Sequence, residues 1–185
     1  MKFLVVFVFS LFYVSRSYAG LFEFGVSGTY RFSEIDENNF TKSNSLTGSV
    51  SYYFMEMSAL ELSYTSGVSH QSVFQSGVQT KYIYEYQHYG ADLVFSFADR
   101  KSSLQPYLKG GVATIEKKLF AEVGNLPREL LREEEPTQVP SVGVGFKLML
   151  TQAISFKAGF DAWGDSDKKF NKWDNAARAG ISIFF

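Results

Sequence analysis

The chain has 185 residues, and its 18 Lys and Arg residues nearly balance 19 Asp and Glu residues, which gives a formal net charge of −1. This balance argues against a nucleic-acid partner, because binding to phosphates requires a clustered excess of positive charge. The absence of cysteine excludes disulfides, thiolate nucleophiles and thiolate metal ligands.

Residues 1–19 have the features of a targeting segment. A positive charge at Lys2 precedes an apolar run over 3–14, and a small-x-small cleavage site ends at Ala19. The apolar run is too short to span a bilayer as a helix. We expect a cleaved signal peptide, with one mature domain over 20–185; a retained membrane anchor is the alternative.

The mature chain contains eight segments in which apolar and polar residues alternate. A period of two is typical of strands that separate two unlike environments. The predicted strands are 22–32, 45–54, 59–65, 81–98, 106–115, 141–150, 154–163 and 176–185. Between them we predict long loops at 33–44, 66–80, 116–139 and 164–174, and short turns at 55–58, 98–105 and 151–152.

The fourth segment is irregular. Tyr82, Tyr84 and Tyr86 fall in the opposite phase to Tyr89. A bulge near Gln87 would exchange the two faces, since one extra residue reverses the alternation. Alternatively, the first half of the segment projects as a hairpin with the preceding strand, and the sequence leaves both possibilities open.

The third long loop contains a helix-start pattern. Asn125 precedes Pro127, and the charged segment 128–135 follows. Proline is favoured at the first helical position, so we predict a capped helical turn here.

The alternation of long and short connections indicates the fold class. Outer-membrane barrels have short turns on the periplasmic side and long loops on the outer side. We therefore predict an all-β protein, an eight-stranded antiparallel up-and-down transmembrane β-barrel. A soluble lipocalin-like barrel would alternate equally well, but aromatic residues near the strand ends and glycines on the polar face favour lipid outside and polar groups inside.

The polar face carries charges of both signs. An eight-stranded barrel is only wide enough for its inward side chains to fill it, so we predict an interior ionic network that plugs the lumen. Its expected members are Glu23, Glu61, Asp92, Lys109, Lys147, Lys157, Asp161 and Arg178, with Arg31 also facing inward. The alternative is that the same charges line a narrow, gated pore.

The last strand, 176–185, places Ile181, Ile183 and Phe185 on one face. It resembles the terminal strand of bacterial outer-membrane β-barrels, which commonly ends in Phe. The resemblance implies that these three residues form the assembly signal that the barrel-assembly machinery reads.

The whole mature chain resembles the small outer-membrane barrels of the OmpA/OmpX type in strand number, loop asymmetry and terminal Phe. This implies a location in the bacterial outer membrane, with a structural or adhesion and surface-recognition role. An extracellular ligand would then bind through the loops 66–80 and 116–139. The alternative function is a narrow channel or a transporter of small hydrophobic molecules, and the third is a lipid-modifying enzyme.

Little in the sequence points to catalysis. The two histidines, His70 and His88, lie in no metal-ligand or triad motif, so we expect no enzyme activity, no cofactor and no metal site. In the fourth loop, Lys168, Lys169 and Lys172 could contact lipopolysaccharide phosphates; a solvated loop is the simpler interpretation.

Overall fold

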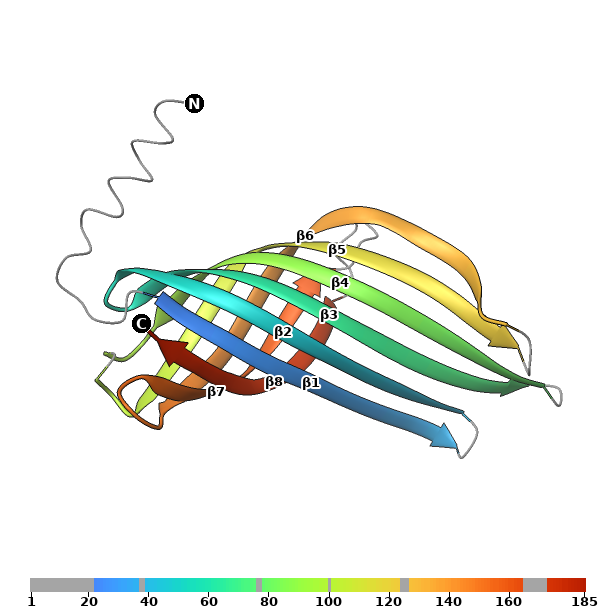
Figure 1. Ribbon diagram of the computed structural model, residues 1–185, viewed down its shortest axis with the longest axis horizontal. Coiled ribbons are helices and arrows are strands. Elements are labelled where there is room, and N and C mark those ends of the chain that lie inside the picture. Colours follow the sequence, from blue (N-terminus) through green and yellow to red (C-terminus); the bar gives the residue numbers. More distant parts are fainter. Residues whose placement is uncertain (1–21, 37–38, 76–77, 100, 124–126, 165–172) are drawn as a thin grey trace, which may run out of the picture.

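Eight antiparallel strands follow one another around a closed barrel in the computed structural model (Figure 1). The structure describes residues 22–36, 39–75, 78–99, 101–123, 127–164 and 173–185. The strands are β1 (Phe22–Asp36), β2 (Asn39–Met55), β3 (Ser58–Gln75), β4 (Val78–Ser96), β5 (Leu104–Val123), β6 (Glu129–Met149), β7 (Ile154–Gly164) and β8 (Trp173–Phe184). The predicted fold, strand number and up-and-down order are confirmed. No helix within these ranges is long and apolar enough to cross a membrane.

The barrel closes between its first and last strands. The Phe22 amide donates a hydrogen bond to the Phe185 carbonyl at 3.2 Å, and the Phe185 amide donates one to the Phe22 carbonyl at 2.8 Å. Antiparallel pairing then continues from Glu23 opposite Phe184 to Gly28 opposite Ala179. Closure leaves no sheet edge between β1 and β8. A lipid bilayer requires this, because an unpaired backbone group inside it has no water to hydrogen-bond with.

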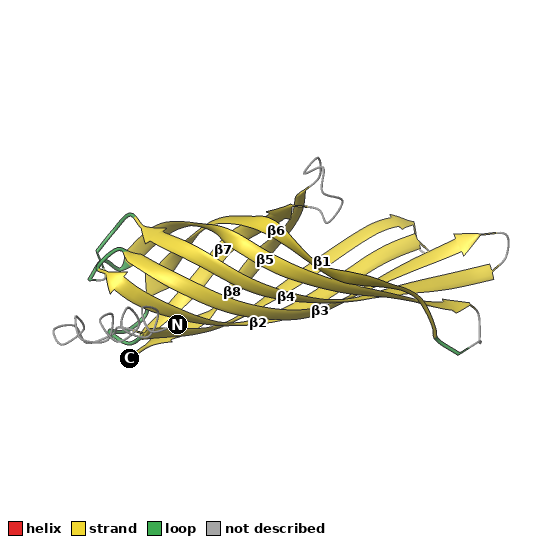
Figure 2. Ribbon diagram, turned by 90° about the horizontal axis from the view of Figure 1, so that it is seen from above, coloured by secondary structure: helices red, strands yellow, loops and turns green. Residues whose placement is uncertain are grey.

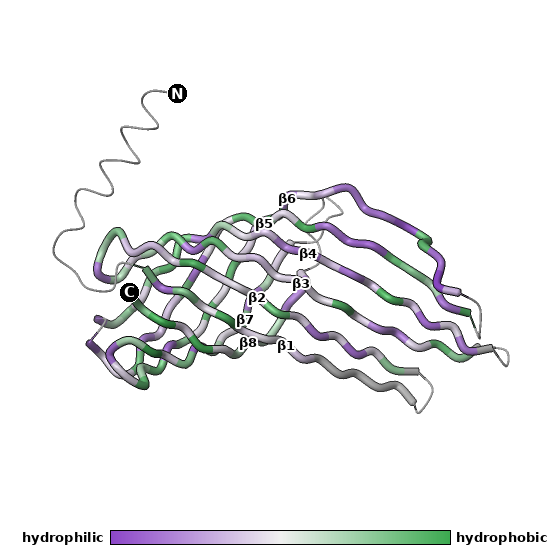
Figure 3. The backbone as a smooth tube through the Cα atoms, viewed as in Figure 1, coloured by the Kyte–Doolittle hydropathy of each residue, from purple (hydrophilic) through white to green (hydrophobic). Residues whose placement is uncertain are grey.

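The outward face forms an apolar belt around the closed part of the barrel. On β3, for example, Leu60, Leu62 and Tyr64 point outward and are exposed, while Glu61 between them is buried. Towards the end where the β1–β2, β3–β4 and β5–β6 hairpins project, the hairpin end, the outward residues change from apolar to polar. The change falls at Asn44, Ser66, Gln87, Glu116, Gln138 and Asn175. Hydrophilic residues are frequent along the strands beyond this border (Figure 3).

Six strands continue past the belt. The β3–β4 hairpin stays paired as far as Gln75 opposite Val78, whereas β7 stops at Gly164 and β8 begins only at Trp173. The outer parts of β1–β6 therefore form a projecting sheet, and the described residues of β7 and β8 do not extend along it (Figure 2). We define the projecting sheet as the parts of β1–β6 beyond the belt border.

This arrangement corrects three predicted loops. The ranges 33–44, 66–80 and 116–139 are strand for most of their described length, and each strand is simply longer than predicted. The prediction missed them because apolar alternation exists only where one face meets lipid. Beyond the belt neither face meets lipid, so backbone pairing continues without the sequence pattern that reveals it.

The predicted helical turn is also wrong. Glu129 begins β6, and the backbone pairs with β5 through Leu119 opposite Arg132. Lys118 on β5 forms an ion pair with Glu133 at 2.7 Å, and this carboxylate holds the pKa of Lys118 above its usual value. Cross-strand pairing therefore overrides the local helix signal, as tertiary context commonly does.

The irregular fourth segment forms a hairpin, not a bulge. β4 pairs with β3 and with β5 without a register shift, and Gln87 lies opposite Ser66. The aromatic residues change face because the environments change. Tyr89 faces outward in the belt, whereas Tyr82, Tyr84 and Tyr86 lie on the face that continues the barrel interior.

Barrel closure depends on the absence of a side chain at Gly180. A Cβ atom there would lie 2.5 Å from Ser27 Cα across the β1–β8 pair, whereas a Cβ atom at the outward Gly48 would meet nothing within 4 Å. We expect Gly180→Ala to lower the free energy of unfolding by about 1–3 kcal/mol, and Gly48→Ala to have little effect. Urea unfolding from lipid vesicles measures both. Equal losses in the two variants would contradict this role of Gly180.

Candidate functional site

The inward-facing side chains of the closed barrel are its candidate functional site, because they decide whether the lumen is open. They form three layers along the barrel axis. At the end that carries the short turns, the turn end, an aromatic and aliphatic layer surrounds one ion pair. The middle layer is ionic, and the third layer, towards the hairpin end, is mainly apolar.

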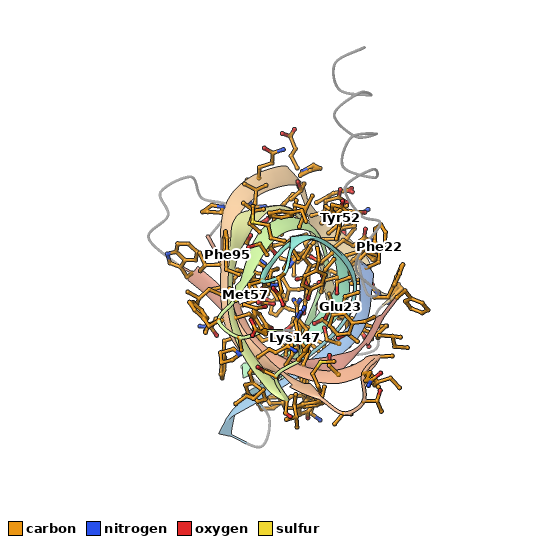
Figure 4. All side chains as sticks on the ribbon, turned by 90° about the vertical axis from the view of Figure 1, so that its left-hand side faces the viewer. Phe22, Glu23, Tyr52, Met57, Phe95 and Lys147 are labelled. Atoms are coloured by element: carbon orange, nitrogen blue, oxygen red, sulfur yellow. The ribbon has the colours of Figure 1, made fainter. Side chains whose placement is uncertain are left out.

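Lys147 and Glu23 form the ion pair of the turn-end layer. The Lys147 Nζ donates to Glu23 Oε2 at 2.6 Å, and both side chains are almost fully buried. The Tyr53 hydroxyl donates to the same carboxylate and accepts from Lys147. The ammonium also lies 5.1 Å from the Tyr53 ring centroid and 5.7 Å from that of Phe184, within the range of cation–π attraction. Figure 4 shows Glu23 and Lys147 inside the ring of strands, with Phe22 and Phe95 on its outer side.

Glu61 is the centre of the ionic layer. Its two carboxylate oxygens accept from different lysines, Oε2 from Lys157 at 2.5 Å and Oε1 from Lys109 at 3.3 Å. The Ser51 hydroxyl donates a third hydrogen bond at 3.3 Å. These partners come from β2, β5 and β7, so one carboxylate on β3 connects strands from several parts of the wall.

Lys109 extends the layer to two further carboxylates. Its Nζ lies 3.1 Å from Asp161 and 3.6 Å from Asp92. Asp161 also pairs with Arg178 at 3.0 Å, and Asp92 accepts from the Ser141 hydroxyl. Across the two layers, four carboxylates (Glu23, Glu61, Asp92 and Asp161) face four bases (Lys109, Lys147, Lys157 and Arg178), so the formal charges of these eight residues sum to zero. Buried charges are tolerated when they are paired and hydrogen-bonded in this way.

The third layer was missed by the sequence analysis. Ala113, Ile115 and Val139 are buried together, with Trp163 packed against them. His88 contacts the Trp163 ring edge-on, with a centroid separation of 5.0 Å. Val139 lies in the range 116–139, which the sequence predicts as a loop. Its position, two residues before the inward-facing Ser141, was the one feature that could have assigned it to the inward face of β6.

The ionic layer is tightly packed. Between Glu61, Lys157, Asp161 and Arg178 lies a cavity of about 20 Å³, which is room for about one water molecule. The arrangement therefore fills the lumen with paired charges and rings, as the width of an eight-stranded barrel requires.

All eight expected members of the interior ionic network face the lumen, and each lies in at least one of the ion pairs described above. The side chain of Arg31, the lysines Lys168, Lys169 and Lys172, and the segment 1–19 lie outside the described residues. Ile181 and Ile183 on β8, and Phe185 after it, face outward and are exposed in the apolar belt.

The described part of the chain shows no arrangement of side chains typical of a catalytic or metal site. His70 is exposed on the outward face of β3, whereas His88 is buried on the inward face of β4, so the two histidines cannot meet. Within the described ranges, no three His, Asp or Glu residues are grouped to hold a metal ion.

A groove lies on the outer face of β2–β5 immediately beyond the belt border. It has a volume of about 610 Å³ and is lined by Leu46, Val68, Gln87, Glu116 and Lys118, among others. Apolar and charged residues meet here at the height where the headgroups of a surrounding lipid layer would lie.

Comparisons with known proteins agree with this geometry. The OprF membrane domain family matches residues 26–185. Among solved structures, the Neisserial surface protein A is similar with a TM-score of 0.64 and 16% identity, over 91% of this chain and 100% of that chain. The N-terminal β-barrel domain of Pseudomonas aeruginosa OprF gives 0.57 and 16%, over 91% and 100%. The attachment invasion locus protein Ail of Yersinia pestis gives 0.51 and 14%, over 90% and 99%. No curated protein sequence gives a significant match.

The ionic layer predicts a large effect from one uncharged substitution. Glu61→Gln would leave the Lys157 ammonium buried without its ion pair, so we expect a loss of about 3–5 kcal/mol in the free energy of unfolding. The matched control is Glu56→Gln in the exposed turn between β2 and β3, where we expect a change within about 0.5 kcal/mol.

Urea unfolding of the two variants in lipid vesicles provides the measurement. Adding Lys157→Met to Glu61→Gln should recover part of the loss, because it removes the uncompensated charge. If Glu61→Gln and Glu56→Gln unfold alike, the buried pairs do not stabilise the barrel.

Proposed function

Because the chain belongs to the OprF membrane domain family and is thus a bacterial outer-membrane β-barrel, we propose that it is a sealed membrane anchor that presents its projecting sheet for recognition outside the cell. The observation that carries this proposal is the combination of a filled, charge-neutral lumen with a six-stranded sheet that continues beyond the belt. The first feature disfavours transport through the barrel. The second provides a rigid surface that a purely structural barrel would not need.

The orientation follows from the connections. Short turns of outer-membrane barrels face the periplasm, and long connections face outward. Here the turn after Met55 and the turn after Leu150 lie at one end together with Phe22 and Phe185, so this end faces the periplasm. The projecting sheet then lies on the cell exterior.

The surface role is supported by the names of two proteins with the same fold. One is called a surface protein and another an attachment invasion locus protein, although at 16% and 14% identity the similarity concerns the fold. The corrected elements change where a ligand would bind. The described residues of the ranges 66–80 and 116–139 lie mostly in strands of a sheet, and we place recognition there. We propose no catalytic role.

Two further partners belong to the same proposal. The outward row of Ile181, Ile183 and Phe185 is available to the barrel-assembly machinery before the last strand closes onto β1. The groove beside Glu116 and Lys118 lies at the height where lipopolysaccharide headgroups would surround the barrel. We propose it as a second contact with lipopolysaccharide, besides the lysines of the fourth loop.

A sealed lumen predicts the absence of a stable conductance. In planar bilayers the purified protein should give no steady single-channel current, because the ion pairs and the apolar layer fill the lumen. A steady current that changes in the Glu61→Gln variant would instead establish the gated pore.

The recognition role predicts an effect of shortening one hairpin. We would replace residues 69–84 by Asn-Gly, which joins Val68 to Glu85, a pair in the present register, through a tight turn. Cells that display this variant should lose binding to epithelial cells and to serum-coated surfaces.

The matched control replaces Glu56 and Met57 by Asn-Gly in the periplasmic turn, where binding should be unchanged. Both variants should still run differently in electrophoresis with and without boiling, which reports an intact barrel. If the shortened hairpin binds like the full chain, the projecting sheet is not the recognition element.

A further inference from the structure

The inner face of the projecting sheet carries three tyrosines at alternate positions of β4. Tyr82, Tyr84 and Tyr86 lie on the face that continues the barrel interior, as the ring contact of Tyr86 with the buried His88 at 5.2 Å shows. Tyr84 is 36% exposed, and the other two are partly exposed. The aromatic series continues inward through His88 to Trp163.

Each tyrosine lies in a cross-strand row with small polar residues. Directly opposed residues on adjacent antiparallel strands lie side by side, so the side chains of one row are close enough to contact one another. From β2 through β3 to β4 the rows are Thr41, Gln71 and Tyr82; Ser43, Ser69 and Tyr84; and Ser45, Gly67 and Tyr86. The inner face thus has an aromatic column on β4 beside a column of hydroxyl and amide groups on β2 and β3.

The geometry of Tyr86 shows that the two columns are in contact. Its ring extends across Gly67, where a Cβ atom would lie 2.5 Å from the ring carbon Cε2. The Tyr86 hydroxyl reaches the Ser43 hydroxyl at 3.4 Å. Gly67 therefore leaves room for the ring above its Cα atom, with the ring hydroxyl beside Ser43.

Two of the basic side chains described near this face are paired with carboxylates. Lys117, beside Tyr86, pairs with Asp174 at 3.4 Å, and Arg132, opposite Leu119, lies 3.6 Å from Glu134. These paired charges favour an uncharged ligand over a strongly anionic or cationic one. The face offers rings for apolar contact and hydroxyl and amide groups for hydrogen bonds.

We propose that this inner face binds an uncharged oligosaccharide, which stacks on Tyr82 and Tyr84 and forms hydrogen bonds with the hydroxyl and amide column. A sugar ring has an apolar C–H face and a polar rim, which match an aromatic column beside hydroxyl groups. The column from Tyr82 to Tyr86 spans about 13 Å along the strand, a length that suits a short oligosaccharide. This inference rests on the proposed recognition role and names its ligand class.

The test uses the full chain in nanodiscs of zwitterionic phospholipid, because detergents with sugar headgroups would compete for the site. An array of uncharged oligosaccharides identifies binders, and titration calorimetry with the strongest gives the affinity. We expect Tyr84→Ala to weaken binding about five- to tenfold and Tyr84→Phe to retain most of it, because the ring supplies the stacking. The matched control is Tyr30→Ala, since Tyr30 points outward at the belt and is exposed there.

A second variant acts on the other column. Ser69→Ala removes a hydroxyl group without a change in the aromatic residues, and we expect weaker binding with the barrel intact. Absence of any bound oligosaccharide, or Tyr84→Ala binding as tightly as the unaltered chain, overturns the inference, as does preferential capture of charged glycans. If the shortened hairpin nonetheless abolishes cell binding, the recognition role stands with a different ligand; if it does not, the recognition role itself is wrong.

Discussion

The mutual neutralisation of charges inside the barrel is the interaction on which the rest of the structure depends. Lipid outside forces the sheet to close so that every backbone group is paired. Closure of only eight strands brings the polar face into a narrow lumen where water cannot solvate separate charges. Glu61 and Lys109 each form ion pairs with residues of more than one strand, and each of the eight charged residues of the two layers has an oppositely charged partner.

Close packing in this barrel also depends on glycines, which let backbone and rings approach where a side chain would not fit. At Gly180 the backbone of β1 approaches so closely that no side chain fits, and at Gly67 a tyrosine ring takes the place of the missing side chain. Glycine weakens an ordinary strand. In this barrel it permits close approach of backbone and rings, so the same residue type contributes to closure in the membrane and to the shape of the surface outside it.

Whether a strand may leave its edge unpaired differs on the two sides of the belt border. In lipid an unpaired edge is excluded, whereas in water an edge is satisfied by solvent, so β1 and β6 can lack a second neighbour beyond the ends of β7 and β8. The edge of β6 carries Pro136 and the acidic residues Glu133 to Glu135. Proline and charge discourage pairing with other chains. These features keep the described edge of the projecting sheet from pairing with other chains.

The sequence by itself determined the barrel, its strand number and the inward orientation of charges such as Glu23 and Lys157, because alternation records which side of each strand meets lipid. It did not determine the strand lengths, and it wrongly predicted a helical turn before Pro136, because the alternating pattern disappears where neither face meets lipid and only pairing with β5 holds the backbone extended. It also could not assign Val139 to an apolar layer or bring Tyr84 beside Ser69. Those neighbourhoods were decided by the tertiary structure alone, because cross-strand register joins residues that no local pattern relates.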